Sequence, residues 1–321
     1  MEDKLDGVIK MYDFKVLSKS RLRGALLLET DKGCKLVKQT KSSAGRLVWE
    51  HRVKTHLKNN GFCNVDAYCI NVEGNISTPD IYGVRYTVSD WFKGRECDLH
   101  SKDEVSLAAK NLGKLHIALD NIECDDIVLP EQPDIIKSFE KHNNELKHIR
   151  NYLRKQKEKN EFEIKLMRAF SKYYDEAVDA VSKLQNLTID EKKHIIHGSY
   201  TYHNIIMCED ESEVIATTIF DKCTCGARVM DIYYFIRKVM EKNDWDYEYG
   251  ENVINSYSSV CKIDSDERVI LKHLLMYPEK FWKLASYYMN SKKTWISQKN
   301  IEKLDALEEQ YSKRLCFISE I

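Results

Sequence analysis

Residues 197–207 read HGSYTYHNIIM, a stretch in which eight residues, most of them polar or aromatic, run directly into three apolar ones. The stretch belongs to a β-rich island, 195–220, that interrupts a long region of helical periodicity. Short strands enclosed by helices must bury one face against those helices. The island therefore predicts a mixed α+β fold.

Helical periodicity dominates both sides of the island. Apolar residues recur at positions 105, 108, 112, 115 and 119, which form the stripe of an amphipathic helix. The other helices expected from the pattern are charged segments at 135–155 and 163–184, and segments at 229–242, 253–260, 267–277 and from 300 onward. The chain after residue 95 is therefore predicted to be mainly helical.

The N-terminal part of the chain has the pattern of strands. The apolar runs 24–30 and 35–38 flank Thr30-Asp31-Lys32-Gly33, which is a signal for a β-hairpin. The elements expected after it are a helix at 46–60, stopped by Gly61, and strands at 67–72 and 82–91.

This order predicts two lobes. The first, 1–92, is β-rich with one helix, and the second, 93–321, is mainly helical and carries the island, here taken as 195–231. A small β lobe followed by a large helical lobe with one β island is the layout of a protein-kinase-like fold.

Composition restricts the function classes. The chain carries 50 basic and 51 acidic residues, and this balance gives no basic footprint for nucleic acid or an anionic membrane. It contains no apolar run long enough for a membrane span, and its first ten residues, MEDKLDGVIK, lack the apolar core of a signal peptide. Ten irregularly spaced cysteines without a CxxC motif predict reduced thiols rather than a zinc site.

The loop 197–204 resembles the catalytic loop of aminoglycoside and choline phosphotransferases, whose pattern is HGD, four residues and then Asn. His197, Gly198 and Asn204 match this pattern at the family spacing, whereas Ser199 stands where the family has the acid. The resemblance implies that Asn204 would hold a magnesium ion and that the acid would accept the proton of the acceptor hydroxyl. A serine hydroxyl cannot act as that base near neutral pH unless a partner deprotonates it.

Two further acids of the family have counterparts downstream. Asp231 opens a predicted helix and matches the aspartate that braces the catalytic loop. The family spacing places Ile219 at the metal-binding aspartate, but a turn two residues shorter would place Asp221 there instead. Because residues 219 and 221 point to the same side of an extended strand, Asp221 is the alternative metal ligand.

The N-terminal lobe supplies two candidates for contact with a nucleotide. Lys38 stands where the family has the strand lysine that contacts nucleotide phosphates, and Glu50, in the following helix, is its expected partner. The phosphate-cradling loop has weak support, because the segment from Val16 to Ala25 contains a single glycine, Gly24.

A second resemblance covers about residues 10–318 and is more specific. The chain resembles the CotS family of spore-coat proteins in the segments 23–30, 91–98 (WFKGRECD), 112–116 (LGKLH), 235–242 (FIRKVMEK) and 277–283 (YPEKFWK), continued by Tyr287, Tyr288, Lys293 and Trp295. The resemblance implies synthesis in the mother-cell cytoplasm without a signal peptide, and assembly on the spore coat with other coat proteins as partners. The aromatic residues of 277–295 also predict a core between two helices.

Three hypotheses for the function follow. The chain is a coat or coat-assembly protein on a kinase-like scaffold that has lost phosphotransfer, an active small-molecule kinase that uses ATP and Mg²⁺, or a nucleotide-binding switch without turnover. A small-molecule acceptor would bind in the insertion 120–193, whose charged sequence offers no aromatic cage for choline.

Overall fold

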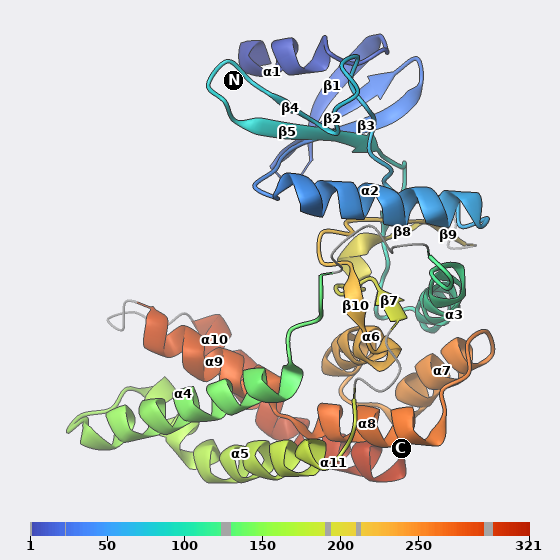
Figure 1. The fold of residues 1–321 in the computed structure, drawn as a ribbon. Coiled ribbons are helices and arrows are strands. Elements are labelled where there is room, and N and C mark those ends of the chain that lie inside the picture. The colour runs from blue at the N-terminus through green and yellow to red at the C-terminus, as the bar shows by residue number, and fades with distance from the viewer. Residues whose placement is uncertain (1, 23, 123–129, 190–193, 210–212, 292–297) are drawn as a thin grey trace. The chain divides into compact units, whose positions relative to one another are not determined.

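The computed structural model describes residues 2–22, 24–122, 130–189, 194–209, 213–291 and 298–321. The chain divides into two compact units, and Figure 1 labels the helices and strands. Unit 1 comprises Met1–Glu131, His194–Asp231 and Val253–Lys262, and unit 2 comprises Gln132–Lys193, Ile232–Asn252 and Ile263–Ile321. The lobe boundary expected between residues 92 and 93 lies inside unit 1 and stays a prediction.

The elements follow the expected order of strands and helices. The strands are β1 (Val16–Leu22), β2 (Ala25–Thr30), β3 (Gly33–Gln39), β4 (Ser77–Pro79), β5 (Arg85–Asp90), β6 (Arg95–Glu96), β7 (His194–Ile196), β8 (Ile205–Met207), β9 (Val214–Thr217) and β10 (Thr224–Gly226). The helices are α1 (Glu2–Ile9), α2 (Ala44–Asn59), α3 (Lys102–Ala118), α4 (Ile135–Lys155), α5 (Glu161–Gln185), α6 (Arg228–Lys242), α7 (Tyr247–Ser258), α8 (Ser265–Met276), α9 (Glu279–Asn290), α10 (Gln298–Glu309) and α11 (Tyr311–Glu320), with the 3₁₀ turn η1 (Tyr202–Asn204). None of the helices in the described part is long and apolar enough to cross a membrane.

Unit 1 contains an antiparallel sheet of five strands in the order β1-β2-β3-β5-β4. The predicted hairpin is confirmed, because Thr30 pairs with Gly33 at the turn between β2 and β3. Gly33 has a φ of 84°, a left-handed conformation that glycine adopts without steric cost. Strand β3 pairs on its other side with β5, which places Lys38 opposite Thr87.

The prediction of a strand at 67–72 is wrong. Tyr68 makes only an isolated bridge to Ser89, and the Asn71 side chain then bends the chain. Its Oδ1 accepts the backbone N–H groups of Glu73 at 3.0 Å and Asn75 at 2.8 Å. A side chain that binds nearby backbone N–H groups competes with strand pairing, so the edge position beside β5 is taken by β4.

Helix α1, for which the sequence pattern gave no expectation, covers this sheet. Val8 and Ile9 of α1 and the following Tyr12 are buried against apolar side chains of the strands. The strand residues of this core are Leu28, Val37 and Val88.

The predicted β-rich island is present, and its strands belong to two small sheets. Strands β6, β8 and β9 make a three-stranded sheet, and β7 pairs with β10. The loop 197–204 leaves β7, passes through η1 and enters β8. The segment with the HGSYTYHN sequence is therefore held at both ends by strands.

Unit 2 contains the charged helices that the periodicity predicted. The helix α4 has the predicted bounds of 135–155, and α5 begins at Glu161, where Asn160 and Glu163 form a capping box. The predicted aromatic core is present: the ring of Tyr277 stacks on Phe139 with centroids 3.7 Å apart. Arg23, Lys293 and Trp295 of the CotS resemblance, and parts of the insertion 120–193, lie outside the described residues.

Candidate functional site

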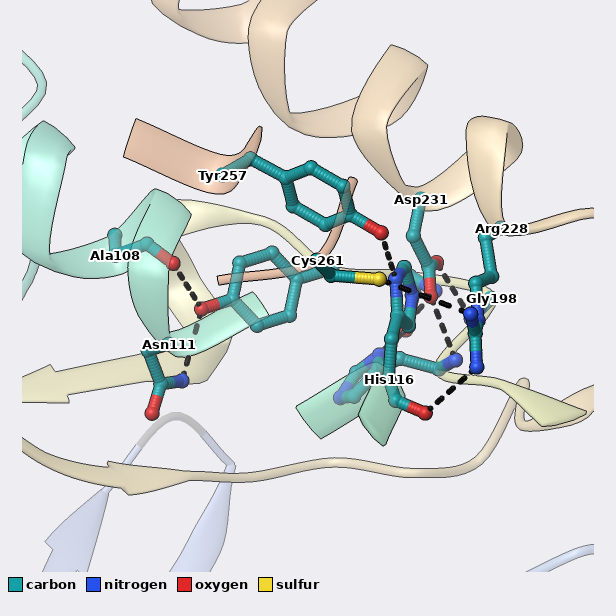
Figure 2. A network of polar contacts seen from close by, with 11 residues as sticks. Ala108, Asn111, His116, Gly198, Arg228, Asp231, Tyr257 and Cys261 are labelled. Atoms are coloured by element: carbon teal, nitrogen blue, oxygen red, sulfur yellow. Dashed lines mark hydrogen bonds and ion pairs between the residues drawn. The ribbon is translucent and has the colours of Figure 1, made fainter. Parts of the chain in front are cut away.

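The loop 197–204 is anchored by Asp231. This carboxylate lies in the first turn of α6, is fully buried, and accepts the backbone N–H of His197 at 2.7 Å and that of Gly198 at 2.9 Å (Figure 2). These are the hydrogen bonds expected from the sequence. A buried carboxylate must be hydrogen-bonded to remain charged, and here the bonds also fix the start of the loop.

Asp231 is itself held by residues that sequence reasoning did not assign. His116 of α3 lies with its Nε2 3.2 Å from Asp231, and its Nδ1 lies 2.7 Å from the Tyr257 hydroxyl (Figure 2). An ionised carboxylate can only accept, so Nε2 of His116 is the donor in the contact with Asp231. The LGKLH motif at 112–116 carries part of the family resemblance, but only the fold shows that its histidine reaches Asp231.

A second group of contacts ties the loop to α3. Asn111 donates its Nδ2 to the hydroxyl of Tyr200 and to that of Thr217, both at 2.9 Å. Tyr200 in turn donates to the carbonyl of Ala108 at 2.8 Å (Figure 2). Tyr200 of the loop and Thr217 of β9 are therefore both linked to α3.

Gly198 occupies a position that no other residue fits. Its φ is 74°, and a Cβ at this position would lie 2.1 Å from the carbonyl oxygen of Lys222. The match of Gly198 to the HGD pattern thus has a steric cause in this chain.

His197 is fully buried, and burial lowers the pKa of its imidazole. Its Nε2 donates to the carbonyl of Thr218 at 3.1 Å, and its Nδ1 accepts the backbone N–H of Ser199 at 3.3 Å. The Ser199 hydroxyl lies 3.4 Å from the same Nδ1, which is long for a hydrogen bond of this type. Because the Nδ1 lone pair already accepts a backbone proton, His197 is poorly placed to deprotonate Ser199.

Asn204 holds the far end of the loop. The Nδ2 of Asn204 donates to the backbone carbonyl of Ser199 at 2.9 Å. The backbone carbonyl of Asn204 accepts the N–H of Thr218 at 2.8 Å. This leaves the side-chain oxygen of Asn204 as a neutral ligand for a cation.

The backbone at residues 219–221 differs from the extended strand on which the Asp221 alternative was based. Strand β9 ends at Thr217, and Ile219 has a φ of 62°, a genuine outlier for a β-branched residue. Its backbone N–H donates to Asp66 Oδ2 at 3.1 Å. The assumption that residues 219 and 221 share one side of a strand is therefore wrong.

A cavity of about 240 Å³ lies beside this loop within unit 1. Its lining residues come from the first three strands, from 91–96 and from the island: Leu22, Ala25, Leu36, Lys38, Trp91, Gly94, Arg95, Glu96, His203, Ile206 and Ile219. Lys38 and Ile219 thus face one cavity, whereas neither Asn204 nor Asp221 belongs to its lining. The loop contributes His203 to the wall of this cavity, and not Asn204.

The expected pair of Lys38 and Glu50 is not formed. Glu50 is buried, and it accepts from Arg46 Nε at 3.0 Å and from the Tyr68 hydroxyl. Arg46 lies one helical turn before Glu50 on the same face of α2, which gives it the shorter route to the carboxylate. Among the described residues, the ammonium of Lys38 has no ion-pair partner.

Two other charged residues near the site were missed. Lys54 of α2 is buried, and its Nζ lies 3.2 Å from Asp66 Oδ1 and 3.9 Å from the centre of the Tyr68 ring. Asp66 thereby connects Lys54 to the backbone of Ile219. The pairing depends on chain segments that the sequence pattern does not place together.

The donor set does not fit a magnesium ion. Mg²⁺ in nucleotide sites is usually held through one or two carboxylates. Glu96 is the one carboxylate among the described residues that line the cavity, and its Oε2 lies 2.7 Å from His203 Nδ1. No group of three or more His, Cys, Asp or Glu side chains that could hold a metal ion occurs within the described ranges. The charge of Lys38 therefore suits the cavity to an anion, whereas the cavity lacks the set of carboxylates that would hold a metal ion.

No protein-family model matches the chain, and no curated protein does. Solved structures match nearly its whole length. An aminoglycoside phosphotransferase from Alicyclobacillus acidocaldarius has a TM-score of 0.86 at 15% identity, with 98% of this chain and 94% of that chain covered. A spectinomycin phosphotransferase in complex with AMP has a TM-score of 0.69 at 10% identity, with 97% and 98% covered. An amicoumacin kinase in complex with AMP-PNP and Ca²⁺ has a TM-score of 0.65 at 13% identity, with 98% and 93% covered.

The structural similarity over nearly the whole chain establishes the fold, but at sequence identities this low it leaves the activity open. The predicted fold class is confirmed, with a small antiparallel sheet near the N-terminus and a helical C-terminal part. The chain has the aminoglycoside phosphotransferase-like form of the protein-kinase-like fold.

Proposed function

We propose that the chain is a kinase-like protein without phosphotransfer activity that serves in the spore coat or in coat assembly. The observation that carries the loss of activity is the presence of Ile219, an apolar side chain, in the cavity lined by Lys38. Ser199 adds to it, because the loop that resembles a catalytic loop has no acid at that position. Phosphoryl transfer is catalysed mainly by positioning and by charge stabilisation, and both of these residues lack the required charge.

The coat role is supported by the resemblance to the CotS family along almost the whole chain. It implies that other coat proteins are the partners and that the chain is made in the mother cell. The experiment is immunogold labelling of purified spores of the source organism with an antibody against the chain. Label over the coat layers is the expected result, and label confined to vegetative cells would exclude this role.

Nucleotide binding without turnover is the second candidate, and Lys38 favours it. Its ammonium has no ion-pair partner in the described part of the chain, yet it faces a largely apolar cavity. Structural neighbours of the chain include complexes with AMP, ADP and AMP-PNP. An adenine base could lie against the apolar lining while Lys38 contacts a phosphate.

ADP is therefore expected to raise the thermal midpoint equally with Mg²⁺ and with EDTA. Binding to the native state stabilises it by about 2.7 kcal/mol at a ligand concentration of 100 Kd. Lys38→Met should remove most of the shift, whereas Lys41→Met, at an exposed position outside the lining, should keep it. A shift seen only with Mg²⁺ would favour the active-kinase hypothesis, and no shift under either condition would exclude nucleotide binding.

A further inference from the structure

Two segments that take no part in the candidate site of unit 1 meet around a cavity in unit 2. The segment 235–242 (FIRKVMEK) lies in α6, and 277–283 (YPEKFWK) begins α9. The cavity has a volume of about 30 Å³, roughly twice the minimum of about 10–15 Å³ that a water molecule needs. Its lining consists of Tyr173, Arg237, Glu241, Trp245, Leu275, Tyr277, Pro278, Glu279, Lys280, Phe281, Leu307, Gln310 and Arg314. A site of this size suits a small ion and excludes a nucleotide.

Arg237 presents an unsatisfied donor to this cavity. The residue is 6% exposed, and its Nη1 donates to Glu241 at 2.7 Å. Its Nε lies 3.2 Å from Glu279 Oε2 but makes no hydrogen bond. A buried guanidinium N–H without a hydrogen bond is costly, so this N–H would gain from an acceptor placed in the cavity.

The two carboxylates that line the cavity, Glu241 and Glu279, already have hydrogen-bond and ion-pair partners. Glu279 accepts from the Tyr233 hydroxyl at 2.7 Å and pairs with Lys283 at 2.5 Å. The charge of Arg237 and these neighbours holds the pKa of Glu279 down at about 2, against the effect of burial. Glu241 pairs with Arg237 and with Lys238. Both carboxylates are therefore paired with basic groups, which offsets part of their repulsion of an anion in the cavity, and neither is free to neutralise a further cation.

Basic groups outnumber acidic groups in the lining of the cavity and in the ion pairs around it. Arg314 pairs with Glu176 at 2.8 Å and donates to the carbonyls of Leu275 and Met276. Lys280 is half-buried and has no ion pair with any described residue, and burial lowers its pKa. The basic groups of the cavity and of its ion pairs are Arg237, Lys238, Lys280, Lys283 and Arg314, against the acids Glu176, Glu241 and Glu279.

The start of α9, whose residues Glu279, Lys280 and Phe281 line the cavity, adds backbone donors. Pro278, the residue before the helix, makes no side-chain cap. The backbone N–H of Glu279 donates to Tyr277 and that of Trp282 to Pro278, while those of Lys280 and Phe281 have no acceptor among the described residues. Free N–H groups at the start of a helix favour a negatively charged ligand.

We propose that this cavity of unit 2 binds a small oxyanion, of the type of phosphate, sulfate or a carboxylate. Lys280 and Arg237 Nε supply charged donors, and the N–H groups of Lys280 and Phe281 supply neutral ones. The anion would also balance the excess of positive charge. This site is independent of the cavity in unit 1 and of the proposed function.

The test is a titration of the full chain with sodium phosphate, sulfate, acetate and chloride at constant ionic strength, followed by the thermal midpoint and by the fluorescence of Trp245 and the other tryptophans. Phosphate or another oxyanion should raise the midpoint and change the fluorescence with saturation, and chloride should do neither. Lys280→Met should weaken the binding about tenfold or more, because it removes a charge-assisted hydrogen bond.

Two variants serve as controls. Lys147→Met, at an exposed position of α4, and Lys38→Met, in the cavity of unit 1, should both bind the oxyanion as the wild type does. Equal responses to chloride and to every oxyanion would overturn the proposal, as would full affinity in Lys280→Met. If Lys280→Met does not fold, calorimetry of the wild type decides instead: a single saturable site for an oxyanion supports the proposal, and the absence of one overturns it.

Discussion

Gly198→Ala is expected to destabilise the protein by about 3–5 kcal/mol, one of the largest effects of any single substitution in this fold. The φ of 74° at Gly198 is unfavourable for alanine, and the added Cβ would lie 2.1 Å from the carbonyl oxygen of Lys222. That oxygen belongs to the backbone, so relief would require the loop or the segment before β10 to move. Urea unfolding followed by circular dichroism measures the loss.

Gly83→Ala is the matched control. Gly83 has a similar φ of 78°, but a Cβ there meets nothing within 4 Å. This variant should lose only the conformational part, about 1–2 kcal/mol. Equal losses in the two variants would mean that Lys222 does not press on the loop as described.

Asp231→Ala is expected to cost about 3–5 kcal/mol, because it removes a buried charge that several groups depend on. The backbone N–H groups of His197 and Gly198 would lose their acceptor, and His116 would lose its partner. Each buried donor left unpaired adds a desolvation penalty of about 1–3 kcal/mol. The free energy of unfolding in urea measures this effect.

Asp221→Ala provides the comparison for Asp231. The residue is exposed, so its loss without ligand should change the free energy of unfolding by no more than about 0.5 kcal/mol. A loss in Asp231→Ala of similar size to that in Asp221→Ala would show that the loop is not anchored by Asp231.

Local patterns were sufficient for several parts of the molecule. The helix at 135–155 and the hairpin at residues 30–33 depend on neighbours in the sequence, and both were predicted. The hydrogen bonds of Asp231 were predicted from a motif that fixes the distance between the loop and α6. In each of these cases the partners are specified by short-range spacing or by a motif of the fold.

Features that depend on competing partners or on the conformation of single residues were not predicted. Glu50 can reach more than one cation, and Arg46 on the same helix takes it in place of Lys38. The positive φ of Ile219 cannot be read from its side chain, because β-branched residues favour extended backbone. The segment containing Asn71 has the apolar pattern of a strand, but one side-chain oxygen turns it.

The absence of phosphotransfer is the central claim, and turnover of ATP in the presence of Mg²⁺ tests it most directly. The measurement is release of ADP by the wild type, with and without a panel of small hydroxylated amines, beside Ser199→Asp/Ile219→Asp and Asp221→Asn. We expect turnover at background in the wild type, and tighter Mg²⁺-dependent nucleotide binding in the double variant, because it restores two carboxylates. Magnesium-dependent turnover by the wild type that Asp221→Asn abolishes would contradict the account and identify Asp221 as the metal ligand.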